Sequence, residues 1–161
     1  MTLPQFIDIE YCDTDSHSYP TAVAWSLADG RIKAVVLSPD DDWLPQLAED
    51  PSVDLRWLYE TGVPVLEVIR EMEHDLADRT VYSDGLDPDE ALVDTLYQTI
   101  NQDTPFEVAP ISELLSDESA ADLEEERRRI LYENQLDATQ AENGVYALLL
   151  LARDKGLIDE E

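Results

Sequence analysis

Cysteine, glycine and lysine are scarce in this sequence of 161 residues, and each scarcity excludes a class of protein. The single cysteine, Cys12, has no companion for an intramolecular disulfide or a zinc site. The five glycines form neither a Walker loop nor a dinucleotide-binding fingerprint. Ten Lys and Arg residues are too few to coat a nucleic-acid backbone, which sequence-independent binding requires. Any nucleic-acid chemistry must therefore take place at a local site.

Long apolar runs are also absent. No run approaches the roughly 20 residues of a membrane span, and the first residues lack the basic and apolar segments of a secretory signal. A chain of this length buries roughly 68 to 70% of its unfolded surface, so one core suffices without disulfide or metal. We therefore expect a soluble, cytoplasmic protein with a single domain over residues 1–161.

Acidic residues are abundant instead. The chain has 38 Asp and Glu residues and a formal net charge of −28, and the acids occur in both halves of the sequence rather than in a tail. Self-repulsion of this size destabilises a compact state unless counterions screen it, which is typical of proteins adapted to high salt. We expect this protein to need salt for full stability.

The order of predicted elements indicates an α/β fold. Three strands are predicted first, with a hairpin between the last two, and amphipathic helices then alternate with two further strands. The predicted strands are 6–11, 21–27, 32–38, 80–83 and 105–110, and the main helices cover 63–76, 92–100 and about 135–153. The segment 39–46 is predicted to be a loop. This order predicts a mixed five-stranded sheet flanked by helices, with three antiparallel strands followed by parallel ones, as in ribonuclease H-like proteins.

The first strand places two carboxylates on one face. Side chains alternate along a strand, so Asp8 and Glu10 lie on the same side, about 7 Å apart. Two like charges in the middle of a covered sheet are costly unless a cation neutralises them. The alternative is an exposed sheet face with ordinary alternation, and the strand alone does not decide between the two.

Further acids come from later segments. Glu142 falls at the edge of the apolar stripe of the last helix, where it points toward the sheet or along its rim. Asp84, Asp87 and Asp89 lie between the fourth predicted strand and the following helix. Each of these three also has a structural explanation as a turn former, a helix cap or a complement to the helix dipole.

These segments together resemble the DEDD family of 3′-5′ exonucleases. The resemblance covers residues 5–153 and consists of D-I-E in the first strand, the segment LRWLYETGVPVLEVIREMEHDL read as a helix, the acidic strand-to-helix junction, and DATQAENGVYALLLLA near the end. The segment IEYCDTDSHSYPTAVAWSL is similar to the small bacterial branch of this family, with Ser18, Tyr19 and Pro20 at the matching spacing.

The resemblance implies a site in which four acids hold two Mg²⁺ or Mn²⁺ ions. Asp8 and Glu10 match the first motif. Asp89 best matches the second with a one-residue insertion, and Asp84 and Asp87 are alternatives. In the third motif, H-x-A-x-x-D, Glu142 stands at the ligand position and Asp137 stands where the family has its catalytic histidine. An ordinary Asp, with a pKa near 3.9, is a weaker base than an imidazole.

The sequence therefore predicts a metal-dependent 3′-5′ exonuclease that acts on short or single-stranded nucleic acid and contacts its 3′ end through the bound metal. The alternative is a catalytically weakened relative that acts as an acidic binding protein. Arg127, Arg128 and Arg129 could contact a nucleic-acid backbone. The pairs of Glu124 with Arg128 and Glu125 with Arg129, four residues apart on a solvated helix, explain this cluster better. The three tryptophans are interpreted as core and lid packing. The sequence does not determine the oligomeric state, and a homodimer is one of the states compatible with it.

Overall fold

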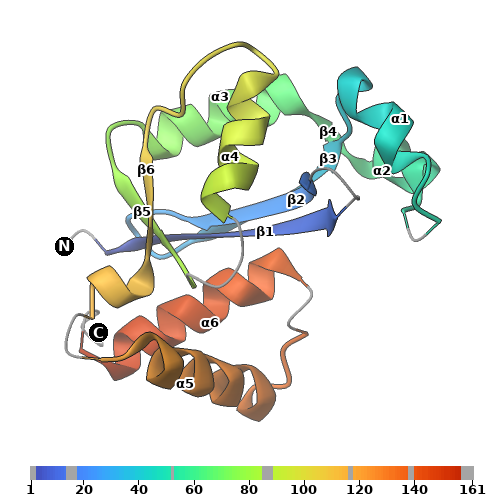
Figure 1. The fold of residues 1–161 in the computed structure, drawn as a ribbon. Helices are drawn as coiled ribbons and strands as arrows, with labels where there is room; N and C mark the ends of the chain where they lie inside the picture. Colours follow the sequence, from blue (N-terminus) through green and yellow to red (C-terminus); the bar gives the residue numbers. More distant parts are fainter. Residues whose placement is uncertain are drawn as a thin grey trace.

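A mixed sheet forms the centre of the computed structural model, which describes residues 3–13, 18–51, 53–84, 89–115, 118–137 and 140–156 (Figure 1). The described residues give six strands in the order β4-β3-β2-β1-β5-β6. The strands are β1 (Gln5–Asp13), β2 (Ser18–Ser26), β3 (Ile32–Ser38), β4 (Val63–Pro64), β5 (Thr80–Ser83) and β6 (Glu107–Pro110).

Helices cover both faces of this sheet. They are α1 (Leu44–Leu47), α2 (Leu55–Thr61), α3 (Val65–Leu76), α4 (Asp89–Gln98), α5 (Ala120–Glu133) and α6 (Ala141–Asp154), with short 3-10 turns η1 (Asp41–Trp43) and η2 (Ile111–Glu113). Helices α3 and α4 lie on one face, α5 and α6 lie on the other, and α1 and α2 lie near the end of β3 (Figure 1). None of the helices in the described part of the chain is long and apolar enough to cross a membrane.

The strand directions confirm the predicted α/β class. β1, β2 and β3 are antiparallel neighbours, whereas β1, β5 and β6 run parallel. This arrangement is consistent with the expected ribonuclease H-like architecture. The predicted number of five strands was wrong by one, because the two-residue strand β4 pairs with the end of β3.

The extra strand follows a break in the segment that was read as one helix. α2 ends at Thr61, just before Gly62, and α3 begins only after β4. A side-chain carbon at Gly62 would lie 2.6 Å from the carbonyl carbon of Leu37, so only glycine lets the chain come this close to β3. The close approach turns one predicted helix into a helix, a short strand and a second helix.

Several other boundaries differ from the prediction, and two of these differences have a clear local cause. The segment 39–46, predicted to be a loop, contains η1 and most of α1, because Asp40 caps the turn through the N–H of Asp42 and Pro45 occupies the first turn of α1. The last helix begins at Ala141 instead of Gln135, which has a positive φ of 57° that a helix cannot accommodate.

The alternation of β1 divides the core into two parts. Ile7 and Ile9 pack with the α3 and α4 residues on one side of the sheet, whereas Phe6 packs with the α6 residues on the other. The predicted apolar stripe of α3 is confirmed, because all five of its members are buried: Val65, Val68, Ile69, Met72 and Leu76.

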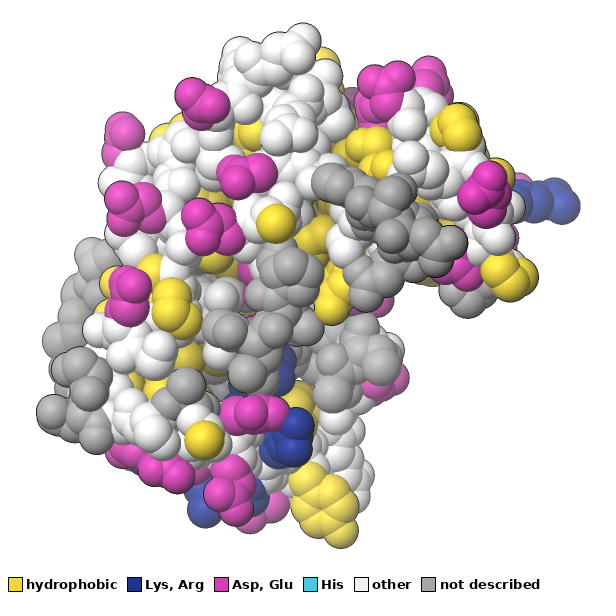
Figure 2. All heavy atoms as spheres, viewed as in Figure 1, with side chains coloured by type: hydrophobic (Ala, Val, Ile, Leu, Met, Phe, Trp, Pro, Cys, Tyr) yellow, Lys and Arg dark blue, Asp and Glu magenta, His cyan; other side chains and the backbone are white. Residues whose placement is uncertain are grey.

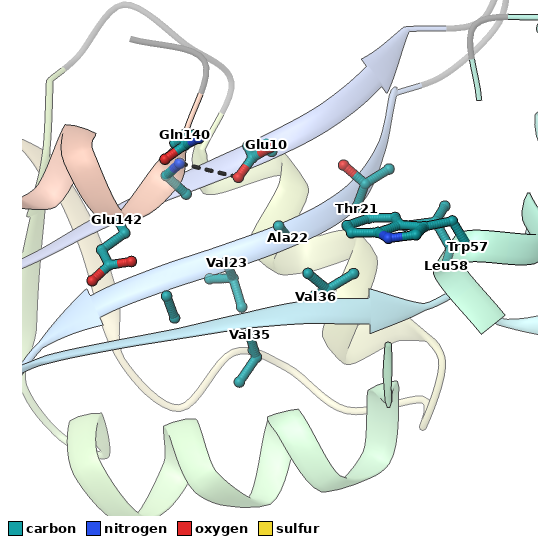
Figure 3. Close-up of a pocket in the computed structure, with 12 residues that line it drawn as sticks. Glu10, Thr21, Ala22, Val23, Val35, Val36, Trp57, Leu58, Gln140 and Glu142 are labelled. Carbon is teal, nitrogen blue, oxygen red and sulfur yellow. Dashed lines mark hydrogen bonds between the residues drawn. The ribbon is translucent and has the colours of Figure 1, made fainter. Parts of the chain in front are cut away.

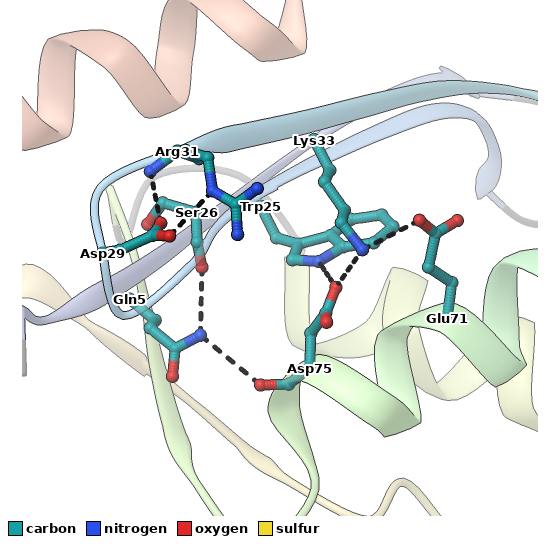
Figure 4. A network of polar contacts seen from close by, with 8 residues as sticks. All are labelled: Gln5, Trp25, Ser26, Asp29, Arg31, Lys33, Glu71 and Asp75. Carbon is teal, nitrogen blue, oxygen red and sulfur yellow. Dashed lines mark hydrogen bonds and ion pairs between the residues drawn. The ribbon is translucent and has the colours of Figure 1, made fainter.

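A network of polar side chains connects α3 to the face of the sheet that this helix covers (Figure 4). Asp75 Oδ2 accepts a hydrogen bond from Trp25 Nε1 at 2.9 Å. The same oxygen forms an ion pair with Lys33 Nζ, also at 2.9 Å. Lys33 Nζ also lies 2.9 Å from Glu71 Oε1. Burial alone would raise the pKa of Asp75, but the hydrogen bonds from Lys33 and Trp25 outweigh it and lower that pKa.

Candidate functional site

The two carboxylates of β1 lie on the face of the sheet that α6 covers, as predicted. Asp8 is buried, and its Oδ1 accepts the backbone N–H of Ile9 at 3.0 Å. Gly144 of α6 lies directly over it, because a side-chain carbon at Gly144 would collide with Asp8 Oδ2. The strand alternation and the last helix therefore enclose Asp8, whereas Glu10 is partly exposed.

Glu10 of β1 caps the start of α6. Its Oε2 accepts the backbone N–H of Ala141 at 3.1 Å, and Gln140, the residue before the helix, makes no side-chain cap of its own. The first N–H groups of a helix lack partners within the helix and attract negative charge. This contact fixes the Glu10 carboxylate beside the helix end.

A guanidinium lies between Asp8 and the acidic junction after β5. Arg127 Nη2 is 3.7 Å from Asp8 Oδ2, and Arg127 Nη1 is 3.5 Å from Asp84 Oδ2. The side chains of Asp8, Asp84 and Arg127 are 10%, 3% and 12% exposed. β1, the end of β5 and α5 thus bring two carboxylates and one guanidinium together, and the side chains of all three are largely shielded from solvent.

The prediction from the sequence did not include Arg127 in the site. Of the three adjacent arginines, Arg128 pairs with Glu124 as expected, whereas Arg129 pairs with Glu133 rather than Glu125. The signal that identifies Arg127 is its spacing: it lies four residues after Leu123 and three before Ile130, both of which are buried. Arg127 therefore lies on the buried stripe of α5 and its two neighbours do not.

An open groove of about 310 Å³ begins at Glu10 (Figure 3). Gln140 lies beside Glu10 at one end, and Trp57 and Leu58 lie at the other. Apolar residues of β2 and β3 form the floor between them: Ala22, Val23, Ala34, Val35 and Val36. Trp57, interpreted from the sequence as packing, is 50% exposed at this groove.

The structure places the other predicted site residues at the starts of α4 and α6 and in the turn before α6. Glu142 is exposed in the first turn of α6, and its carboxylate points away from Glu10 in the close-up (Figure 3). Asp89 begins α4, and both of its carboxylate oxygens are buried. Asp137 is exposed, and its backbone carbonyl accepts the N–H of Gln140 at 3.2 Å in the turn before α6. Asp87 lies outside the described residues.

The donor chemistry of the site suits a hard cation. Asp8, Glu10 and Asp84 offer only carboxylate oxygens, which Mg²⁺ and Mn²⁺ prefer. The guanidinium of Arg127 already supplies one positive charge beside Asp8 and Asp84, so a cation is compatible with this position. In the described ranges, no three His, Cys, Asp or Glu side chains are grouped closely enough to hold a metal ion. The two-metal centre therefore stays a prediction.

Comparison with known proteins does not identify this chain: no family model matches the sequence, and no curated protein matches it.

Proposed function

We propose that this protein is a metal-dependent 3′-5′ exonuclease-like phosphodiester hydrolase that acts on short or single-stranded nucleic acid. The observation that supports this proposal best is that Asp8 and Glu10 share the α6 side of β1, and that Asp84, at the end of the neighbouring strand β5, shares the guanidinium of Arg127 with Asp8. This arrangement links the D-I-E motif to the acidic junction on which the resemblance to the DEDD exonucleases rests.

In this proposal Asp8, Glu10 and Asp84 would hold Mg²⁺ or Mn²⁺, with Asp89 and Glu142 as further candidate ligands. When bound, the metal would activate water and neutralise the phosphate of the substrate. The contact with the Ala141 N–H keeps the Glu10 carboxylate in place at the entrance of the groove. Asp137, at the position of the expected base, is a weak proton acceptor at neutral pH.

The size of the groove favours a small substrate over a long duplex. Its volume of about 310 Å³ is at the low end of small-ligand pockets. The net charge of −28 repels extended phosphate backbones, so contacts beyond the nucleotides nearest the site gain little. A substrate that presents only its 3′ end to the carboxylates suits both properties.

A second candidate function is a catalytically weakened relative that acts as an acidic binding protein. Arg127 favours it, because a guanidinium beside Asp8 and Asp84 can balance their charges without any metal. The exposed Asp137 in place of a histidine favours it as well.

Calorimetric titration with Mn²⁺ separates the two candidates. We compare the wild type, Asp8→Asn, and Asp41→Asn as a matched control that removes an exposed negative charge from η1. The exonuclease proposal predicts saturable binding in the wild type and in Asp41→Asn, and a loss of affinity of about a hundredfold or more in Asp8→Asn. Absent binding, or equal binding in all three proteins, would leave only the second candidate.

A nuclease assay tests the chemistry directly. Single-stranded DNA and RNA oligonucleotides labelled at the 5′ end should shorten progressively from the 3′ end in the presence of Mn²⁺. Asp137→His should raise the rate by about tenfold or more if the weak base limits turnover. No shortening by either the wild type or Asp137→His would contradict hydrolysis at this site.

A further inference from the structure

Arg127 differs from its two neighbours in what surrounds its charge. The side chains of Arg128 and Arg129 are 74% and 61% exposed and pair with acids on their own helix. The side chain of Arg127 is 12% exposed, and its Nε is buried without a hydrogen-bond partner in the described part of the chain. A buried guanidinium costs free energy unless carboxylates compensate it, so Asp8 and Asp84 hold it in this position.

The contacts of Arg127 are loose for an ion pair. Its separations from Asp8 and Asp84, 3.7 and 3.5 Å, exceed the roughly 2.7 to 2.9 Å of charge-assisted hydrogen bonds. One guanidinium is shared between two carboxylates, so the three groups together keep one negative charge. Charge and confinement hold the guanidinium rather than short bonds, and another cation can therefore replace it.

The space around Asp8 does not allow a second cation beside the guanidinium on the α6 side. A side-chain carbon at Gly144 would lie 2.7 Å from Asp8 Cγ and 3.2 Å from Arg127 Nη2. The backbone of α6 therefore already closes this side. The guanidinium lies between Asp8 Oδ2 and Asp84 Oδ2, so a metal ion that bridges these two carboxylates has to take its position.

We propose that Arg127 is the resident counter-cation of Asp8 and Asp84, and that a divalent metal ion must displace its guanidinium to bind these carboxylates. This inference rests on the proposed function and adds a competitor to its metal site. Metal loading is then coupled to α5, because Arg127 leaves the site whenever a metal ion enters. Removing the guanidinium should strengthen metal binding.

The test is calorimetric titration with Mn²⁺ of the wild type, Arg127→Gln, and Arg128→Gln. The control Arg128→Gln removes the same charge from the same helix at an exposed position, so it corrects for the general attraction of cations to an acidic protein. We expect Arg127→Gln to bind Mn²⁺ about tenfold or more tightly than both other proteins. The double variant Asp8→Asn/Arg127→Gln should lose this gain.

The outcomes distinguish this inference from the proposed function. Saturable binding of equal affinity in all three proteins would overturn the role of Arg127 and leave the metal site intact. Binding by Arg127→Gln alone would support the inference and favour the second candidate function. Absent binding in every protein would overturn both proposals.

Arg127→Gln leaves two buried carboxylates without their guanidinium, so its folding needs a separate measurement. Thermal unfolding with and without Mn²⁺ should show a larger metal-dependent rise of Tm than in Arg128→Gln. If Arg127→Gln does not fold, Arg127→Lys replaces it, because an ammonium group is a compact charge that cannot span both carboxylates as a guanidinium does. Equal Mn²⁺ affinity of Arg127→Lys and the wild type would then contradict the inference.

Discussion

Gly144 is the residue on which the packing of α6 over Asp8 depends. The Oδ1 atom of Asp8 accepts the N–H of Ile9, and its Oδ2 lies near Arg127, so the carboxylate has little freedom to move aside. A side-chain carbon at Gly144 would collide with this carboxylate. Glycine is a poor helix former, so its presence inside α6 is explained by this contact.

We predict that Gly144→Ala lowers the free energy of unfolding by about 1 to 2 kcal/mol, because overpacking outweighs the gain in helix propensity. The measurement is denaturant unfolding of the single variants Gly144→Ala and Asp8→Ala and of the double variant. In the Asp8→Ala background the collision is gone, and the same substitution should be neutral or stabilising. An equal cost of Gly144→Ala in both backgrounds would show that Asp8 is not the obstacle.

Single residues were predictable where the pattern is local. The alternation of β1 was sufficient to place Asp8 and Glu10 on one face, because neighbouring side chains of a strand point in opposite directions. Arg127 was not placed, because its two partners come from β1 and the end of β5, far away in the sequence. Ion pairs predicted from the sequence join residues three or four positions apart on one helix, and this spacing cannot reveal partners from other elements.

At the scale of elements, α3 is attached to the sheet by charge as well as by apolar contacts. Asp75 lies near the end of α3, and its side chain is 9% exposed between Trp25 and Lys33 of neighbouring strands. Its pKa is lowered despite burial, because the hydrogen bonds from Lys33 and Trp25 stabilise the ionised form. The hydrogen bond to Asp75 is also the main cause of the raised pKa of Lys33.

A lowered pKa in the folded state stabilises the fold at pH values above the unfolded pKa of about 3.9, and this stabilisation is lost as the pH falls through the folded pKa. We predict that Asp75→Asn lowers the free energy of unfolding by about 1 to 3 kcal/mol at neutral pH. The difference from the wild type should shrink as the pH falls below about 4.

The measurement for Asp75 is denaturant unfolding of both proteins across the acidic pH range at constant salt. Glu71→Gln is the control, because Glu71 also contacts Lys33 but its side chain is 43% exposed. It should change stability less than Asp75→Asn at every pH. A difference between Asp75→Asn and the wild type that does not depend on pH would contradict the ionic role of Asp75.

Elements were predictable where one apolar stripe dominates. The apolar stripe of α3 was predicted correctly, because its five buried residues repeat with helical spacing, but the helix begins at Val65 rather than at residue 63. The strand β4 was not predictable, because two residues give no period and pair with β3 only after Gly62 lets the backbones come close. The directions of the remaining strands were predicted correctly, because a hairpin and helical crossovers restrict the topology strongly.

For the whole molecule, the net charge of −28 is the dominant property. Acidic side chains are spread over the face shown in Figure 2, above and below the middle of the molecule, and Lys and Arg side chains are few there. Ion pairs such as those of Lys33 and Lys155, each with two acids, offset only a small part of this charge. The rest repels itself in the folded state more strongly than in an expanded chain.

We predict that Tm rises with salt, by on the order of 10 °C between about 0.1 and 2 M NaCl, if screening restores several kcal/mol of stability. Screening depends on ionic strength, and the Debye length falls from about 10 Å at 0.1 M to about 3 Å at 1 M, so most of the rise should occur below 1 M. NaCl and Na₂SO₄ at equal ionic strength should then give nearly the same Tm in this range. A rise with sulfate alone would instead indicate exclusion of the salt from the protein surface, and a constant Tm would contradict salt adaptation.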